Sequence, residues 1–171
     1  MPQEALLLIG QNDVEIDAKQ RLLVPADVRK SIEPERDGKT LILVLGLNGK
    51  QWLYPELKYK ALVKEVEPDI TPGEAELDFA HANFALAERL EWDTQGRLQF
   101  SKEWQEESEL GKEVTLIGAG DHLEIWNRAD WVARKLELRR RHAEIAIRAK
   151  NERKSPGTVP ATEKRGSPAN A

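Results

Sequence analysis

An aspartate and an arginine four residues apart occur twice in the chain, as Asp17 with Arg21 and as Asp93 with Arg97. A carboxylate beside a tight turn can accept backbone N–H bonds, and a guanidinium can bind that carboxylate through two hydrogen bonds. The alternative is recognition of DNA, because a guanidinium near an ammonium, here Lys19, suits phosphates and guanine edges. These residue types favour a structural role for the aspartates and DNA contact for Arg21, and they leave Lys19 open between the two.

The two Asp–Arg pairs lie within similar stretches, 14–25 and 90–101, which are 76 positions apart. A second similarity, between 43–55 and 115–127, follows at an offset of 72. Repetition of this kind indicates one structural unit written twice. Each unit of about 60 to 75 residues is near the size at which a hydrophobic core is marginal. We therefore expect the two halves to share a core.

The elements that must position these pairs are short strands and helices. In each copy a strand, the Asp–Arg turn, a second strand and a helix start are expected, followed by a hairpin and another helix. The Asn48–Gly49 pair is a strong hairpin-turn signal in the first copy. The predicted strands are 6–16, 21–24, 40–45, 51–54, 86–92, 97–100, 114–118 and 122–126. The predicted helices are 25–32, 55–66, 74–85, one from Ser101 and one over 128–153 capped by Asn127, with a loop over 33–38.

These elements suggest a five-part domain plan. Two repeats occupy 1–66 and 86–136, and a linker with a short helix occupies 67–85, where two prolines and a glycine break the helical pattern. A basic helical extension covers 137–154. The last segment, 155–171, is rich in proline and small polar residues, so we expect a disordered tail there.

Composition excludes several classes of protein. The chain has no cysteine, and its three histidines, His81, His122 and His142, lack metal-ligand spacing, so neither a metal site nor a cofactor is expected. No glycine-rich phosphate loop or nucleophile–base motif occurs, so we do not expect an enzyme. The N-terminal apolar run is too short for a signal peptide or a membrane span, which predicts a cytoplasmic protein without membrane contact.

Charge is distributed unevenly along the chain. The formal net charge is −4, yet 65–113 holds 14 acidic and 4 basic residues, whereas 128–154 holds 10 basic and 4 acidic residues. The basic cluster Arg139–Arg141 in the terminal helix has two interpretations: a solvated helix face, or a surface that adds non-specific phosphate contacts. If DNA is bound, the first repeat or this helix is the expected contact face.

Several spaced motifs make the chain resemble a known family. In the first half these are Gly10, the Asp17 to Arg29 segment with Arg21 and Pro25 between them, and 46–55. In the second half they are Asp93 with Gly96 and Arg97, followed by 118–126. The pattern is similar to that of the MraZ family, bacterial transcriptional regulators built from two SpoVT/AbrB-type swapped-hairpin domains. The resemblance covers about 8–136.

The resemblance implies a mainly β protein with helices, of the α+β class: a tandem, pseudo-symmetric, swapped-hairpin AbrB-like β-barrel. It also implies a nucleoid-associated homo-oligomer, a ring, that binds double-stranded DNA at direct repeats upstream of its own cell-wall and division operon. Arg21 is the family's DNA-contacting position, and the preceding basic residue is Lys19. The motif positions that support the fold are Asp17, Arg29, Asp93 and Arg97.

The chain departs from the family pattern at four positions. Gln20 replaces the glycine before Arg21, and Ile9 replaces a basic residue. In the second copy Ser101 and Gln105 stand where Pro25 and Arg29 stand in the first. A ring could compensate for a weak single contact by engaging several DNA repeats at once. The alternative function is a structural or interaction ring that has lost specific DNA binding and holds a protein partner instead.

Overall fold

Eight short strands form in the computed structural model, which describes residues 5–65 and 71–154. The strands are β1 Gln11–Glu15, β2 Arg21–Leu23, β3 Thr40–Leu45, β4 Gln51–Pro55, β5 Glu88–Glu91, β6 Arg97–Gln99, β7 Glu113–Gly118 and β8 Leu123–Asn127. The helices are α1 Ala26–Ser31, α2 Pro34–Asp37, α3 Glu56–Lys64, α4 Glu74–Ala80, the π-helical η1 His81–Ala85, α5 Lys102–Glu107, α6 Arg128–Arg140 and α7 His142–Lys154. The chain divides into two compact units, Met1–Val132 and Ala133–Ala171.

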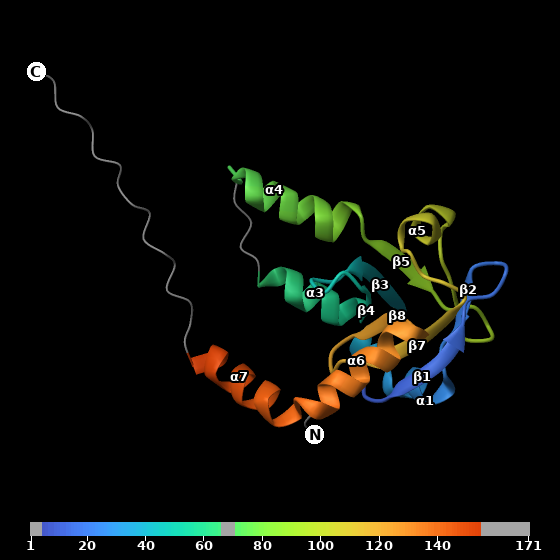
Figure 1. The fold of residues 1–171 in the computed structure, drawn as a ribbon. Helices are drawn as coiled ribbons and strands as arrows, with labels where there is room; N and C mark the ends of the chain where they lie inside the picture. Colours follow the sequence, from blue (N-terminus) through green and yellow to red (C-terminus); the bar gives the residue numbers. More distant parts are fainter. Residues whose placement is uncertain (1–4, 66–70, 155–171) are drawn as a thin grey trace, which may run out of the picture. The chain divides into compact units, whose positions relative to one another are not determined.

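Strands from the two repeats are interleaved within the first unit (Figure 1). Six strands form an antiparallel sheet in the order β1-β7-β8-β4-β3-β5, and β2 pairs with β6 as a separate two-stranded ribbon. Single bridges, Ile16 to Leu22 and Trp92 to Leu98, link the ribbon to the strands beside it. Each strand therefore meets two neighbours, although no continuous ladder closes the sheet into a barrel. The predicted α+β fold with interleaved hairpins is confirmed.

The strand register reveals an internal twofold symmetry. Leu22 lies opposite Leu98 in the ribbon, and Trp52 lies opposite Glu124 where β4 meets β8. These pairs are 76 and 72 positions apart, the same offsets that relate the two copies in the sequence. Equivalent residues thus face each other across the symmetry axis, so each half completes the other's sheet.

One part of the sequence alignment of the repeats was wrong. Leu43 pairs with Leu53, and Leu116 pairs with Ile125, so β3 and β7 correspond at an offset of 73 rather than 72. The cause is turn length: 46–50 connects β3 to β4, whereas the shorter 119–122 connects β7 to β8. Loop length sets hairpin register, and a run of similar aliphatic residues does not reveal a shift of one position.

The two repeats share one hydrophobic core, as expected. Leu22 and Leu98 are completely buried on the inner face of the ribbon, and the inner residues of β3 and β7 pack into the same cluster. That cluster contains Leu8, Ile16, Leu22, Val24, Val28, Ile32, Leu41, Leu43, Leu53, Leu90, Leu98, Phe100, Trp104, Val114, Leu116, Leu123 and Ile125. Neither half therefore has a complete core of its own.

Four local predictions were wrong. The expected loop at 33–38 contains α2, in which the Asp37 carboxylate accepts hydrogen bonds from the Glu33 N–H and from Arg36. The long strand predicted at 6–16 is regular only over β1. The predicted capping residue Asn127 instead bonds the backbone of the 109–111 loop. The terminal helix is divided at Arg141 into α6 and α7. Of the predicted break at 67–73, residues 67–70 lie outside the described residues, as does the predicted tail at 155–171.

Candidate nucleic-acid interface

The first Asp–Arg pair closes the turn between β1 and β2. Asp17 Oδ1 accepts the backbone N–H groups of Lys19 and Arg21, both at 2.9 Å. Asp17 Oδ2 accepts Nε of Arg21 at 2.8 Å and lies 2.7 Å from its Nη2. The hydrogen bonds from the Arg21 side chain and backbone lower the pKa of the Asp17 carboxyl to about 2. Arg21 is thus a positioned cation with one edge bound to its own turn.

The second pair reproduces this arrangement between β5 and β6. Asp93 Oδ1 accepts the N–H groups of Gln95 at 2.8 Å and Arg97 at 3.0 Å, and Oδ2 accepts Nε of Arg97 at 2.6 Å. The backbone bond from Arg97 is the main cause that lowers the pKa of the Asp93 carboxyl. Both aspartates therefore accept backbone hydrogen bonds that close their turns, which is the structural role that the sequence favours for them.

Both turns need a left-handed residue just before the arginine. Gly96 has φ +77°, and Gln20 has φ +62° in the equivalent position. Gly96 also lies against the guanidinium of Arg29, whose Nε donates to the Val24 carbonyl at 3.0 Å, so a side chain at 96 would displace Arg29. Arg29 thus connects α1 of one repeat to the turn of the other, a placement that fits a supporting role.

The outward face of the ribbon brings the two arginines together. Leu22 and Leu98 point into the core, so their neighbours in β2 and β6 point out. Arg21 lies opposite Gln99, and Arg97 lies opposite Leu23. The arginines are therefore diagonal neighbours, roughly 7–8 Å apart at the backbone. The sequence motif predicts a supporting role for Arg97. The strand register instead makes Arg97 the equivalent of Arg21, and the 76-residue offset between the two copies is the sequence signal for this equivalence.

Lys19 is exposed in the first turn, which contains a direct contact between the repeats. Its carbonyl accepts Nε2 of Gln99 at 2.6 Å. Among the described residues its ammonium makes no ion pair, and Nη1 of Arg21 has no hydrogen-bond partner. The second turn has Gln95 where the first has Lys19. Figure 1 shows both turns at the same end of the sheet, near β2. The interface is thus a small cationic surface with more charge on the first repeat.

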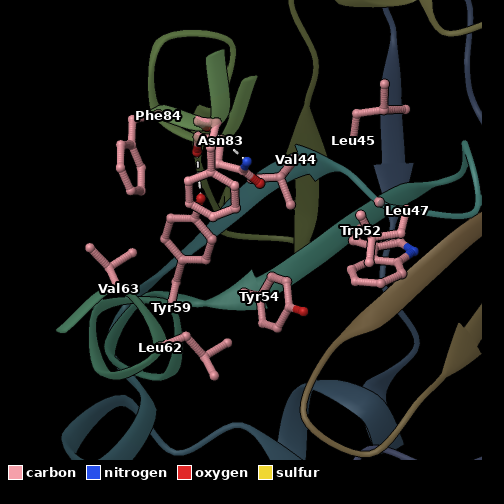
Figure 2. Close-up of a pocket in the computed structure, with 12 residues that line it drawn as sticks. Val44, Leu45, Leu47, Trp52, Tyr54, Tyr59, Leu62, Val63, Asn83 and Phe84 are labelled. Atoms are coloured by element: carbon pink, nitrogen blue, oxygen red, sulfur yellow. Dashed lines mark hydrogen bonds between the residues drawn. The ribbon is translucent and has the colours of Figure 1, made fainter. Parts of the chain in front are cut away.

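A second feature of this unit is an apolar hollow of about 160 Å³. Figure 2 shows that residues of β3 and β4, among them Val44 and Trp52, form one wall, with Tyr59 of α3 and Phe84 of η1 on the other side. The Tyr59 hydroxyl donates to the Asn83 carbonyl across the hollow. The walls are aromatic and aliphatic, with few polar groups, so the hollow lacks the convergent donors and acceptors of a polar-ligand site.

Two kinds of site are missing from the part of the chain that the structure describes. No cluster of three or more histidine, cysteine, aspartate or glutamate side chains there could hold a metal ion. Within residues 5–65 and 71–154, no helix is both long and apolar enough to cross a membrane. The surface of the β2–β6 ribbon is thus the candidate site that the residues themselves indicate.

Comparison with known proteins agrees with a chain that contains two repeats. The model of the family described as "MraZ protein" matches residues 7–79 and 84–152, one segment for each repeat. The matched segments cover most of the chain. The chain belongs to the MraZ family.

Several curated relatives are named "Transcriptional regulator MraZ". The protein from Heliobacterium modesticaldum is 32% identical over 126 residues, which cover 73% of this chain and 84% of the relative. The protein from Pelotomaculum thermopropionicum is 30% identical over 141 residues, covering 82% and 93%. The protein from Pediococcus pentosaceus is 26% identical over 125 residues, covering 73% and 84%. These names describe regulators of transcription rather than enzymes.

Proposed function

We propose that this protein is a sequence-specific, DNA-binding transcriptional regulator that uses the outward face of the β2–β6 ribbon. The observation that carries the proposal is the pair of positioned arginines, Arg21 and Arg97, on one exposed ribbon face. A two-stranded ribbon fits the major groove of B-DNA, and arginine is the most frequent side chain on guanine edges there. Family membership and the names of the relatives support the same function.

The mechanism assigns different tasks to the cations. Asp17 and Asp93 hold the guanidiniums in fixed orientations, which lowers the entropy lost on binding. The free edge of each guanidinium contacts a base, and Lys19 contacts a neighbouring phosphate without reading sequence. Arg29 acts indirectly by holding the second turn. We further propose a cytoplasmic, nucleoid-associated protein, because its ligand is chromosomal DNA.

Assembly into a ring on direct repeats upstream of the protein's own cell-wall and division operon is the second part of the proposal. Large apolar side chains near the hollow are exposed: Leu45, Leu47, Phe79, Phe84 and Leu86. Exposed apolar surface of this extent is typical of protein contacts, and a second copy of the chain is the proposed partner. Several ribbons on one ring would bind repeated sites with avidity, which offsets the net charge of −4.

Fluorescence anisotropy of the purified protein on DNA from upstream of its gene, beside scrambled DNA, tests the function. The Arg21→Ala variant should lose the preference for upstream DNA while keeping its fold and oligomeric state. Arg21→Lys is the matched control, because it keeps the charge but cannot form the same paired hydrogen bonds. It should retain binding to scrambled DNA and lose most of the preference. Upstream preference unchanged in Arg21→Ala would contradict the proposal.

The number of DNA repeats tests the ring. Duplexes carrying one, two and four repeats should bind progressively more tightly, since each bound ribbon raises the effective concentration of the next. Equal affinity for all three duplexes would exclude avidity. If the wild-type protein shows no preference for upstream DNA at any salt concentration, the alternative of a structural ring with a protein partner replaces the regulator.

A further inference from the structure

The helical unit after Val132 carries its negative charges on one stripe. Glu137 pairs with Arg134 at 2.8 Å and with Arg141 at 3.1 Å, and Arg141 also pairs with Glu144 at 2.9 Å. Arg148 and Glu152 continue the stripe at 2.8 Å. Each pair is three or four residues apart, the spacing of neighbours on one helix face. All three glutamates between 133 and 154 are therefore occupied by arginines.

The remaining cations of these helices form what we call the unpaired set: Lys135, Arg139, Arg140, Lys150, Arg153 and Lys154. None of them makes an ion pair with another described residue. All but the half-buried Lys135 are exposed. The charge excess of the segment is thus concentrated on side chains that are free to meet an external anion.

The positions of the apolar residues on these helices distinguish between two anionic partners, a membrane surface and duplex DNA. In α7 the two large apolar residues, Ile145 and Ile147, lie two positions apart, which is about 200° around a helix. In α6 the same spacing separates Leu136 from Leu138. An amphipathic membrane-surface helix needs a wide continuous apolar face, and neither helix has one. A helix of 13 residues is ~20 Å long, a length over which duplex DNA carries on the order of ten phosphates.

We propose that the unpaired set is a second DNA-contact element, which binds phosphates of the same duplex without reading its sequence. This inference rests on the proposed function, because it assigns the helices to the same ligand. The paired stripe keeps the glutamates away from the phosphates, so the cations act without nearby repulsion. The β2–β6 ribbon provides the preference for a DNA sequence, and the helices provide affinity that depends on salt but not on sequence.

The experiment neutralises the four exposed members of the unpaired set that precede Lys154, the last residue of α7. The test variant carries Arg139→Gln, Arg140→Gln, Lys150→Gln and Arg153→Gln. The matched control keeps every charge, with Arg139→Lys, Arg140→Lys, Lys150→Arg and Arg153→Lys. Anisotropy titrations on upstream and scrambled duplexes are repeated at several salt concentrations, and circular dichroism checks that both variants keep their helices.

The neutral variant should lose the same factor in affinity for both duplexes, leaving the ratio unchanged. The slope of log K against log salt should become shallower by about 3 to 4, near 0.9 for each lost contact. The control should match the wild type. Unchanged affinity and slope in a helical neutral variant would overturn the inference while the ribbon's preference survives. A control as weak as the neutral variant would also overturn it, since phosphate binding does not depend on which cation is present.

Discussion

The residue before each arginine shows how two copies of one motif have diverged. Gly96 adopts φ +77° without steric cost, whereas Gln20 holds φ +62° with a side chain that disfavours this region. The strain costs on the order of 1 kcal/mol, and the Asp17 and Arg21 hydrogen bonds impose it. In the first turn, the backbone strain at Gln20 lowers local stability while the turn holds Arg21 in position.

Replacement of this residue gives a direct test. Gln20→Gly should raise the free energy of unfolding by a few tenths to about 1 kcal/mol, because the relieved strain exceeds the entropy that glycine adds to the unfolded chain. Gly96→Ala should lower the free energy of unfolding, because alanine disfavours φ +77° and its Cβ would clash with the Arg29 guanidinium. Urea denaturation of both variants measures the two changes in the free energy of unfolding. Destabilisation by Gln20→Gly would show that the glutamine side chain contributes contacts that outweigh the strain.

His122 is a buried titratable group apart from the ribbon. Its Nδ1 lies 2.7 Å from Asp121 and its Nε2 lies 3.4 Å from Glu124, and its ring packs on Trp52 and Tyr54. Burial lowers the pKa of His122, but hydrogen bonds to Glu124 and Asp121 outweigh it, so the pKa is raised above 6.5. The charged imidazolium is therefore favoured in the folded protein.

The sign of the pH effect follows from the raised pKa. The stabilisation is complete below the ordinary histidine pKa of about 6.5 and is lost as the pH rises through the raised value. The free energy of unfolding should fall with pH across that window. In His122→Gln this part of the pH dependence should disappear. Lys58 lies 3.9 Å from Asp121. Burial raises the pKa of the Tyr54 hydroxyl to about 12, so this group stays neutral throughout the window. An identical slope in His122→Gln would assign the effect to another group.

At the scale of elements, the β2–β6 ribbon carries both the site and part of the core. Its inner leucines, Leu22 and Leu98, face each other and are completely buried. Either one changed to alanine should cost about 2–5 kcal/mol, by lost transfer free energy plus the cavity left behind. Because the two share one cavity, the double variant should cost a different amount from the sum of the single changes. Denaturation of the three variants measures this coupling, and strict additivity would contradict direct packing across the axis.

Much of this architecture could be predicted from the sequence, because the Asp–Arg turns and the Asn48–Gly49 hairpin are local signals with strong geometry. The similarity of the two copies at an offset of 76 residues indicated the pseudo-twofold symmetry. The 73-residue correspondence of β3 and β7 could not be predicted, since Leu43 and Leu116 are set in register by turn length. α2 was missed because Pro34 and Gly38 read as loop residues, although proline suits the first turn of a helix.

The candidate site was only partly accessible from the sequence. Arg21 and Lys19 were recognisable from residue type and spacing. The placement of Arg97 beside Arg21 depends on pairing between strands that are distant in the chain, which no local pattern encodes. Likewise, the contact between Arg29 and Gly96 joins different repeats. Interleaving of the two copies is what brings these residues together.

At the scale of the molecule, neither repeat is self-sufficient. β1 pairs with β7 and β3 with β5, so each half relies on strands of the other. The β2–β6 and β4–β8 pairings join equivalent strands, so two copies of one repeat could form the same arrangement. Residues 1–66 alone should therefore be either unfolded or dimeric. Analytical ultracentrifugation with circular dichroism distinguishes these states, and a folded monomer would contradict the shared core.

The central claim is that the β2–β6 ribbon is the surface that meets DNA. The most direct measurement is photocrosslinking from a benzophenone amino acid placed at Leu23 on the outer face of the ribbon, where the leucine is 50% exposed. The matched control places it at Leu47, which is fully exposed in the turn between β3 and β4. With upstream duplex, the account predicts crosslinks from position 23 that unlabelled upstream DNA competes away, and none from position 47. Crosslinks from position 47 alone would contradict it, because another surface would then meet the DNA.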